Sequence, residues 1–351
     1  MISKRTTWIY LGLFLLLVFL GLKYAEPVDH YDGLMYYAYL PTLLIDHDLD
    51  FANQYTILQC YSWYSTTYTG HLNNYMAIGP AILWSPFFIL IHIAILIINL
   101  FGFHLPINGN VFPYTLSPLL GNICCFLISL HLIYRWCRKY FSTSISILAI
   151  SSIILSSFNI FYLIYAPSYS HITSMATVTW FIYYWDKIRE NRTTGSWLIL
   201  GLLSGLMTLM RWQNCIFAWV LLVDIIESGI KSWQTKNFPA IRKLFLNVIL
   251  YGTVVFISLL PQMVIWKILY GHYITIPFGS GYMFWKYPMI VETLWSSRNG
   301  LFSWAPLILF GFIGFIFFYQ RNRRVTIYLL ITFLIMLYIN SCVADWWGVS
   351  G

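Results

Sequence analysis

The sequence predicts an all-α, polytopic membrane protein. Of its 351 residues, 59% are hydrophobic and only 9% are charged, and the mean hydropathy is +0.70. A soluble domain usually carries about a quarter charged residues, and disordered segments are poor in aromatic residues, which make up 20% of this chain. The basic residues are scattered between long apolar runs rather than gathered on one solvated face, as nucleic-acid binding requires. These observations exclude a soluble, a disordered and a nucleic-acid-binding protein.

Long apolar runs predict about nine membrane crossings, because a transmembrane helix needs about 20 apolar residues. The first run, Thr7–Leu22, follows Lys4 and Arg5 and is not followed by a small-residue cleavage site. It is therefore expected to be an uncleaved helix with its N-terminus in the cytosol. The other runs lie near Ala77–Phe101, Pro113–Tyr134, Ser142–Tyr165, His171–Trp185, Trp197–Met210, Cys215–Ile226, Leu244–Leu269, Pro306–Phe318 and Val325–Ile339.

The distribution of charge predicts the orientation of these runs, since cytosolic loops carry an excess of Lys and Arg. One arrangement places fifteen of the twenty basic residues in the cytosol and eight of the twelve acidic residues outside. The arrangement requires that Ala77–Phe101 does not cross fully. Pro80 and Pro86 interrupt the start of this run, so an interfacial or re-entrant segment is expected there.

The chain is expected to form one transmembrane domain over residues 1–351. Its first external loop, residues 23–112, would contain juxtamembrane helices, and a second large external loop would span residues 270–305. The C-terminal residues Asp345–Trp347 lie outside in this arrangement and are followed by only four residues. We expect the chain to be a truncated version of something longer.

The polar chemistry is predicted on the outer face. Transporters and pumps usually keep ionisable residues at the membrane midplane, whereas Asp224 is the clearest such candidate here and lies near a cytosolic end. Transfer of a sugar from a polyprenyl phosphate to a hydroxyl needs a base for the hydroxyl proton. It also needs cations or N–H donors on the departing phosphate. An acid near the start of the first external loop and an arginine at a helix end, Arg211, meet these needs.

Six segments in chain order resemble the membrane-embedded GT-C glycosyltransferases, in the branch of the protein O-mannosyltransferases and the lipid A aminoarabinose transferase. The resemblance runs over nearly the whole chain and includes the first helix with a cytosolic N-terminus. The segments are Asp32–Tyr37, Ile78–Trp84, Tyr165–His171, Gly201–Gly205, Arg211–Asn214 and Ser297–Trp304. The chain differs from the family pattern at Gly33, Gly79 and His171.

The resemblance implies an inverting glycosyltransferase that takes a monosaccharide from a polyprenyl-phosphate carrier. The acceptor would be a hydroxyl of a glycan, a lipid or a protein, on the non-cytosolic face of a bacterial-type inner membrane. By the same resemblance, Asp32 is the catalytic base or the carboxylate that orients the acceptor, and Tyr36 is the aromatic residue that follows it. The tie between loop polar residues and function favours this role over a solvated loop acid or a helix cap.

The remaining candidates each have a second interpretation. Asp29 is the fallback for the base. His171 is either a phosphate or acceptor contact or an ordinary interface histidine. Arg211 is favoured as a phosphate clamp over a snorkelling or Asp-paired arginine. Arg298 and Lys286 are either donor-phosphate or acceptor contacts or solvated loop residues, with the second interpretation slightly favoured for Lys286.

No cofactor is firmly predicted. Asp46, Asp48 and Asp50 would suit a divalent cation, but helix capping and solvation are favoured. Gly201 and Gly205 form a small-xxx-small pair that predicts close helix packing.

Two other functions remain open, a flippase for lipid-linked sugars and a non-catalytic assembly subunit. The first would move its substrate without chemistry. The second would tolerate loss of Asp32, Arg211 and Arg298 together, but not loss of a packing face.

Overall fold

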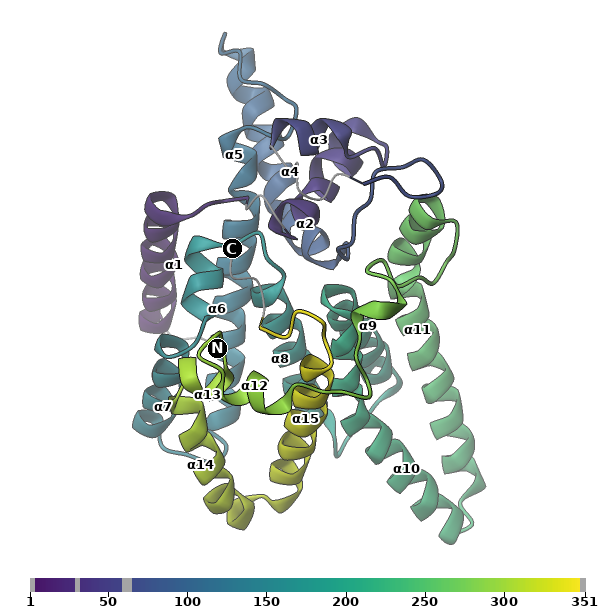
Figure 1. Cartoon of the computed structure of the whole chain (residues 1–351). Helices are drawn as coiled ribbons and strands as arrows, with labels where there is room; N and C mark the ends of the chain where they lie inside the picture. The colour runs from purple at the N-terminus through teal and green to yellow at the C-terminus, as the bar shows by residue number, and fades with distance from the viewer. Residues whose placement is uncertain (1–3, 29–31, 59–64, 348–351) are drawn as a thin grey trace.

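The computed structural model describes residues 4–28, 32–58 and 65–347, and these ranges contain helices, turns and two isolated bridges but no strand (Figure 1). The helices are α1 (Lys4–Tyr24), α2 (Asp32–Pro41), α3 (Ala52–Ile57), α4 (Gly79–Leu100), α5 (Phe112–Thr115), α6 (Ser117–Cys137), α7 (Thr143–Leu155), α8 (His171–Ile188), α9 (Thr194–Met210), α10 (Trp219–Gln234), α11 (Phe238–Tyr270), α12 (Ile290–Trp295), α13 (Leu301–Trp304), α14 (Leu307–Arg321) and α15 (Arg323–Ser341). Short π- and 3₁₀-helical turns cover Thr42–Asp46, Phe161–Tyr165, Trp212–Ala218 and Ser280–Tyr282. The all-α prediction is confirmed for the described residues.

Two glycines on α9 allow this helix to pack closely against α11. A Cβ atom at Gly201 would lie 2.9 Å from the backbone oxygen of Tyr251, and one at Gly205 would lie 2.3 Å from the Cβ atom of Ser258. Both distances are too short for a side chain to fit without movement. The predicted packing role of Gly201 and Gly205 is therefore confirmed.

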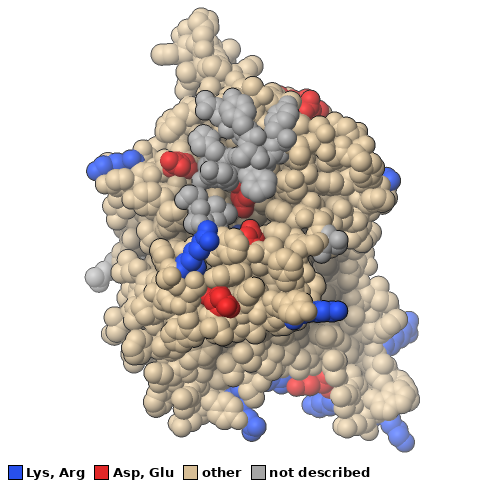
Figure 2. Space-filling model, in the orientation of Figure 1, with Lys and Arg blue, Asp and Glu red and all other residues tan. Residues whose placement is uncertain are grey.

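Several basic loops meet at one end of the bundle, which we call the basic end. Lys139, just after α6, pairs with Asp186 of α8 at 2.6 Å. Arg324, at the start of α15, pairs with Asp224 of α10 at 2.8 Å. Figure 2 shows several Lys and Arg side chains along the lower edge of the molecule. Basic residues that are dispersed along the sequence are therefore collected at one end by the fold.

The first loop folds into a cap of short helices at the opposite end. Residues 33–41 of α2 are all buried, and they pack with α3 and the first half of α4. A Cβ atom at Gly79 would lie 2.2 Å from the backbone oxygen of Leu209, so α4 starts in direct contact with the end of α9. Trp84 of α4 then donates its indole N–H to Oδ1 of Asn122 on α6 at 2.9 Å. In Figure 1, α4 lies beyond the upper ends of α6, α8 and α9.

Four helices in the described ranges are long and apolar enough to cross a membrane: α4, the continuous stretch Phe112–Cys137, α11 and α15. Four shorter apolar helices have 10–17 residues. The expected count of nine crossings is thus not confirmed by helix length and composition. The physical reason is that several apolar runs end early, as at Arg211, where α9 stops after 17 residues and a 3₁₀ segment follows.

Candidate active site

The first turn of α2 positions the predicted acid and the aromatic residue that follows it. Asp32 is the first residue of the helix and is partly exposed. An acidic side chain is favourable at this position because the helix N-terminus carries partial positive charge. Tyr36 lies one turn later, on the same face, and is only 6% exposed. Asp32 therefore lies at the partly exposed start of a buried helix, and the buried Tyr36 side chain lies one helical turn further along α2.

Arg211 reaches this phenol from the other side of the fold. The residue ends α9 in an extended conformation, with φ of −152°. Its Nε atom donates to Oγ of Ser170 at 2.9 Å, and Oγ of Ser170 donates to the Tyr36 hydroxyl at 3.0 Å. The described contacts thus give Arg211 polar side-chain partners, and among the described residues none of them is the aspartate that one of the two alternative interpretations proposed. They connect the end of α9, the turn before α8 and the start of α2.

His171 is the second side-chain partner of Arg211. Nη2 of Arg211 donates to Nε2 of His171 at 3.0 Å. A guanidinium group can only donate, so Nε2 must accept and the imidazole must be neutral, with its proton on Nδ1. The ring also stacks on Tyr162, with centroids 3.7 Å apart and planes inclined by 21°. The structure therefore places His171 between an aromatic ring and an arginine.

Asp32 and Arg211 both influence the pKa of the buried Tyr36 phenol. Burial raises the pKa of the Tyr36 phenol above its ordinary value, the Arg211 guanidinium lowers it and the Asp32 carboxylate raises it. Both charges also act on Tyr162 and Tyr282. The predicted acid, one helical turn before Tyr36, and the predicted cation, linked to Tyr36 through Ser170, are therefore brought to the same tyrosine, although they are 179 positions apart in the sequence.

Tyr282 belongs to a third part of the site that the sequence analysis did not identify. Its hydroxyl donates to Oδ1 of Asp345 at 2.6 Å. Burial, followed by the hydrogen bond to Asp345, raises the pKa of this phenol. The ring stacks on Phe278 with centroids 4.5 Å apart, and Phe278 stacks on Tyr75 at 5.0 Å. This row of rings extends from the segment before α4 to the segment after α11.

Backbone pairing holds the C-terminal segment against this second loop. The amide of Phe284 donates to the carbonyl of Cys342 at 2.6 Å, and the amide of Ala344 donates to the carbonyl of Tyr282 at 2.9 Å. The pairing brings Asp345 next to Tyr282. No local sequence motif predicts the contact between Tyr282 and Asp345, because the sequence identifies Asp345 only as one of several acids expected in external loops.

The other predicted site residues lie apart from these contacts. Arg298 lies over the ring of Trp347, 4.8 Å from its centroid, and is exposed. Lys286 is exposed and makes no hydrogen bond or ion pair within the described ranges. Asp29 lies outside the residues that the structure describes.

Asp46, Asp48 and Asp50 accept local hydrogen bonds. Asp46 accepts from the side chains of Asn53 and Gln54 at 2.8 and 2.6 Å, and Asp50 accepts from the amide of Ala52 at 3.1 Å. Asp48 likewise accepts from the amide of Asp50. These are turn and side-chain contacts, and the N-cap of α3, Phe51, makes no side-chain cap hydrogen bond. Among the described residues, no group of three or more His, Cys, Asp or Glu side chains is placed to hold a metal ion.

Comparison with known proteins finds a family match in the middle of the chain. Residues 112–266 match the family model described as dolichyl-phosphate-mannose-protein mannosyltransferase, a family of the GT-C superfamily. No curated protein and no solved structure matches the chain. The matched range includes Ser170, His171 and Arg211, but not Asp32 or Tyr282. The match confirms the expected resemblance to the GT-C glycosyltransferases and indicates a membrane glycosyltransferase of that type.

Proposed function

We propose that this protein is an inverting glycosyltransferase that moves a monosaccharide from a polyprenyl-phosphate carrier to a hydroxyl acceptor. One observation carries the proposal: Asp32 begins α2, and Tyr36, one turn later, is linked by hydrogen bonds through Ser170 to Arg211, at the end of the bundle opposite the basic end. A carboxylate can take a proton, and a guanidinium can neutralise a phosphate. The two groups that this transfer needs are therefore together.

The reaction would be a single displacement at the anomeric carbon. Asp32 takes the proton of the acceptor hydroxyl as the acceptor oxygen attacks the anomeric carbon from the side opposite the phosphate. The bond between that carbon and the phosphate oxygen breaks, and its electron pair leaves with the polyprenyl phosphate. Arg211 stabilises the negative charge that develops on this leaving group. The configuration at the anomeric carbon is inverted.

The partners of Arg211 suit it for this role. Ser170 and neutral His171 orient its guanidinium group by accepting two of about five N–H donors. Neither partner carries a negative charge, so the cationic charge remains available to an incoming phosphate. Tyr36 receives a hydrogen bond from Ser170, and its own proton can therefore be donated to a substrate oxygen. We retain Arg298 and Lys286 as further contacts to donor or acceptor.

The lengths of α8 and α9 support placement of the site on the non-cytosolic face. The 18 residues of α8 lead from His171 to the basic end, a rise of about 27 Å at ~1.5 Å per residue. The 17 residues of α9 return from the basic end to Arg211. With the basic end in the cytosol, the site would face the outer side of a bacterial-type inner membrane. Nine helices of the described chain, α4 excluded, would then cross.

Reconstitution tests this function directly. The purified protein in liposomes would receive a polyprenyl-phosphate monosaccharide and a panel of glycan, lipid and peptide hydroxyl acceptors. We expect free polyprenyl phosphate and a product of inverted anomeric configuration, measured by mass spectrometry and NMR. Movement of the intact donor across the membrane without cleavage would instead support the flippase. Neither cleavage nor movement by the folded protein, with every acceptor class, would support an assembly subunit.

A further inference from the structure

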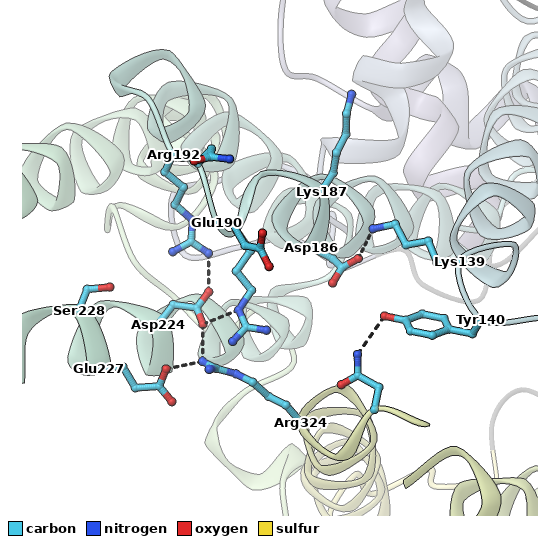
Figure 3. A pocket seen from close by; sticks show the side chains of 13 residues that line it. Lys139, Tyr140, Asp186, Lys187, Glu190, Arg192, Asp224, Glu227, Ser228 and Arg324 are labelled. Carbon is cyan, nitrogen blue, oxygen red and sulfur yellow. Dashed lines mark hydrogen bonds and ion pairs between the residues drawn. The ribbon is translucent and has the colours of Figure 1, made fainter. Parts of the chain in front are cut away.

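An open pocket of about 620 Å³ lies at the basic end, one helix length away from the candidate active site (Figure 3). Side chains from the end of α8, the middle of α10 and the start of α15, and from the loops after α6 and α8, line it. Its walls are mostly polar or charged. Neither the proposed transfer nor the family match assigns a role to this pocket.

One buried carboxylate organises the pocket floor. Asp224 is 4% exposed. Its Oδ1 atom accepts from Arg189 Nε at 3.2 Å and from Arg324 Nη2 at 2.8 Å, and its Oδ2 atom accepts from Arg192. The indole N–H of Trp185 also donates to Oδ2, at 2.7 Å. Figure 3 shows Arg192 and Arg324 reaching Asp224 from different parts of the chain.

The three arginines around Asp224 have more N–H donors than hydrogen-bond acceptors to receive them. Each guanidinium group has about five N–H donors, and Asp224 engages one nitrogen of each arginine. Arg324 additionally donates to Glu227 and Tyr328. The side chain of Arg192 is only 10% exposed, yet its Nε atom is buried without a hydrogen-bond partner. Three cations around one carboxylate leave local positive charge and unused donors.

The other acids in the wall do not cancel this excess. Asp186 is engaged by Lys139 at 2.6 Å and by the indole of Trp136 at 3.0 Å. Glu227 is engaged by Arg324 at 2.5 Å. The complete wall holds five cationic residues against four acidic ones, a net charge of one positive unit. The cations are Lys139, Lys187, Arg189, Arg192 and Arg324, and the acids are Asp186, Glu190, Asp224 and Glu227.

We propose that this pocket binds a phosphate group, carried either by a lipid headgroup or by a soluble phosphate compound. Phosphate offers several acceptor oxygens and accepts paired N–H bonds from arginine. The pocket also lies at the end of helices that we place across a membrane, where basic pockets between helices bind anionic headgroups. Asp224 keeps the three arginines together when the pocket is empty.

Two substitutions with opposite expected effects test the proposal. Arg189→Gln removes a half-buried donor and is expected to weaken phosphate binding at least ~10-fold, since hydrogen bonds to charged groups are stronger than neutral ones. Asp224→Asn removes the competing carboxylate and is expected to strengthen phosphate binding. A purely structural ion-pair network predicts no gain of affinity in Asp224→Asn. Arg242→Gln, which removes an exposed charge on α11 outside this pocket, is the control for net charge.

The measurement is the thermal stability of the protein in nanodiscs, titrated along two arms. One arm adds inorganic phosphate to phosphatidylcholine nanodiscs, and the other replaces part of the phosphatidylcholine with phosphatidylglycerol. Stabilisation in either arm that Arg189→Gln weakens and Arg242→Gln leaves intact supports the site, and the responding arm identifies the source of the phosphate. Equal responses of both variants and the wild type, or no response in either arm, overturn the proposal. If Asp224→Asn does not fold, the stabilisation of Arg189→Gln compared with that of Arg242→Gln still tests whether the pocket binds phosphate.

Discussion

Nη2 of Arg211 lies 3.0 Å from Nε2 of His171, and this contact joins the end of α9 to the start of α8. The chain passes through both helices and the basic end between these two residues. The contact therefore closes a helical hairpin at the end where Asp32 and Tyr36 lie. A histidine and an arginine that were separate candidates in the sequence form one unit.

Substitution of Arg211 by lysine tests the phosphate clamp. Lysine keeps the positive charge but lacks the planar fork that reaches Ser170 and His171 together. We expect kcat to fall by about 10²–10³, the usual loss on removal of one stabilising donor. Steady-state transfer from a polyprenyl-phosphate sugar measures this.

The matched control is Arg242→Lys, on the exposed surface of α11, which is expected to keep wild-type kcat. Wild-type kcat in a folded Arg211→Lys protein would show that the fork geometry does not matter and would contradict the clamp.

Tyr282→Phe tests the aromatic row over the site. The phenylalanine keeps the stack on Phe278 but cannot donate to Asp345. We expect a rise in the apparent KM of donor or acceptor of about tenfold, the scale of a hydrogen bond to a charged group. Asp345→Asn should have an effect in the same direction, because it alters the same bond.

Tyr287→Phe is the control for this pair, since Tyr287 lies on the same loop and is 75% exposed. Equal kinetics of Tyr282→Phe and Tyr287→Phe would mean that the second loop takes no part in substrate binding.

Gly205→Ala tests the packing of α9 against α11. The added Cβ atom would lie 2.3 Å from the Cβ atom of Ser258, and overpacking of this kind costs about 1–3 kcal/mol. Gly252→Ala is the matched control on α11, because a Cβ atom there meets nothing within 4 Å. Thermal unfolding in detergent should show a lower midpoint for Gly205→Ala only. Equal midpoints would contradict the close approach of the two helices.

The sequence predicted features that depend on composition and local pattern. Its hydropathy predicted the helical class, and the spacing of Gly201 and Gly205 predicted a tight helix pair. The prolines at the start of α4 favoured a segment that does not cross fully, but α4 is a continuous helix of 22 residues that is long and apolar enough to span a membrane, so this expectation stays a prediction. Arg211 was chosen for its position at a helix end, where the structure also places it, whereas Asp32 was chosen as a loop acid and is the first residue of α2.

Features that depend on contacts distant in sequence were not predictable in this way. Tyr282 and Asp345 meet because the second loop pairs with the C-terminal segment, which a single sequence does not reveal. Asp224 was noted as an isolated acid, but the three arginines around it come from different helices and loops. The number of membrane crossings also depends on tertiary structure, because the length of a short apolar helix does not show whether it spans the membrane.

The most direct measurement is the transfer rate of Asp32→Asn in reconstituted liposomes. Asparagine preserves shape and can still cap the start of α2, but it cannot accept the hydroxyl proton. The proposal predicts a fall in kcat of about 10²–10⁴, the usual contribution of a general base, with the unfolding midpoint unchanged. Transfer at the wild-type rate by a folded Asp32→Asn protein would contradict the central claim that this carboxylate activates the acceptor.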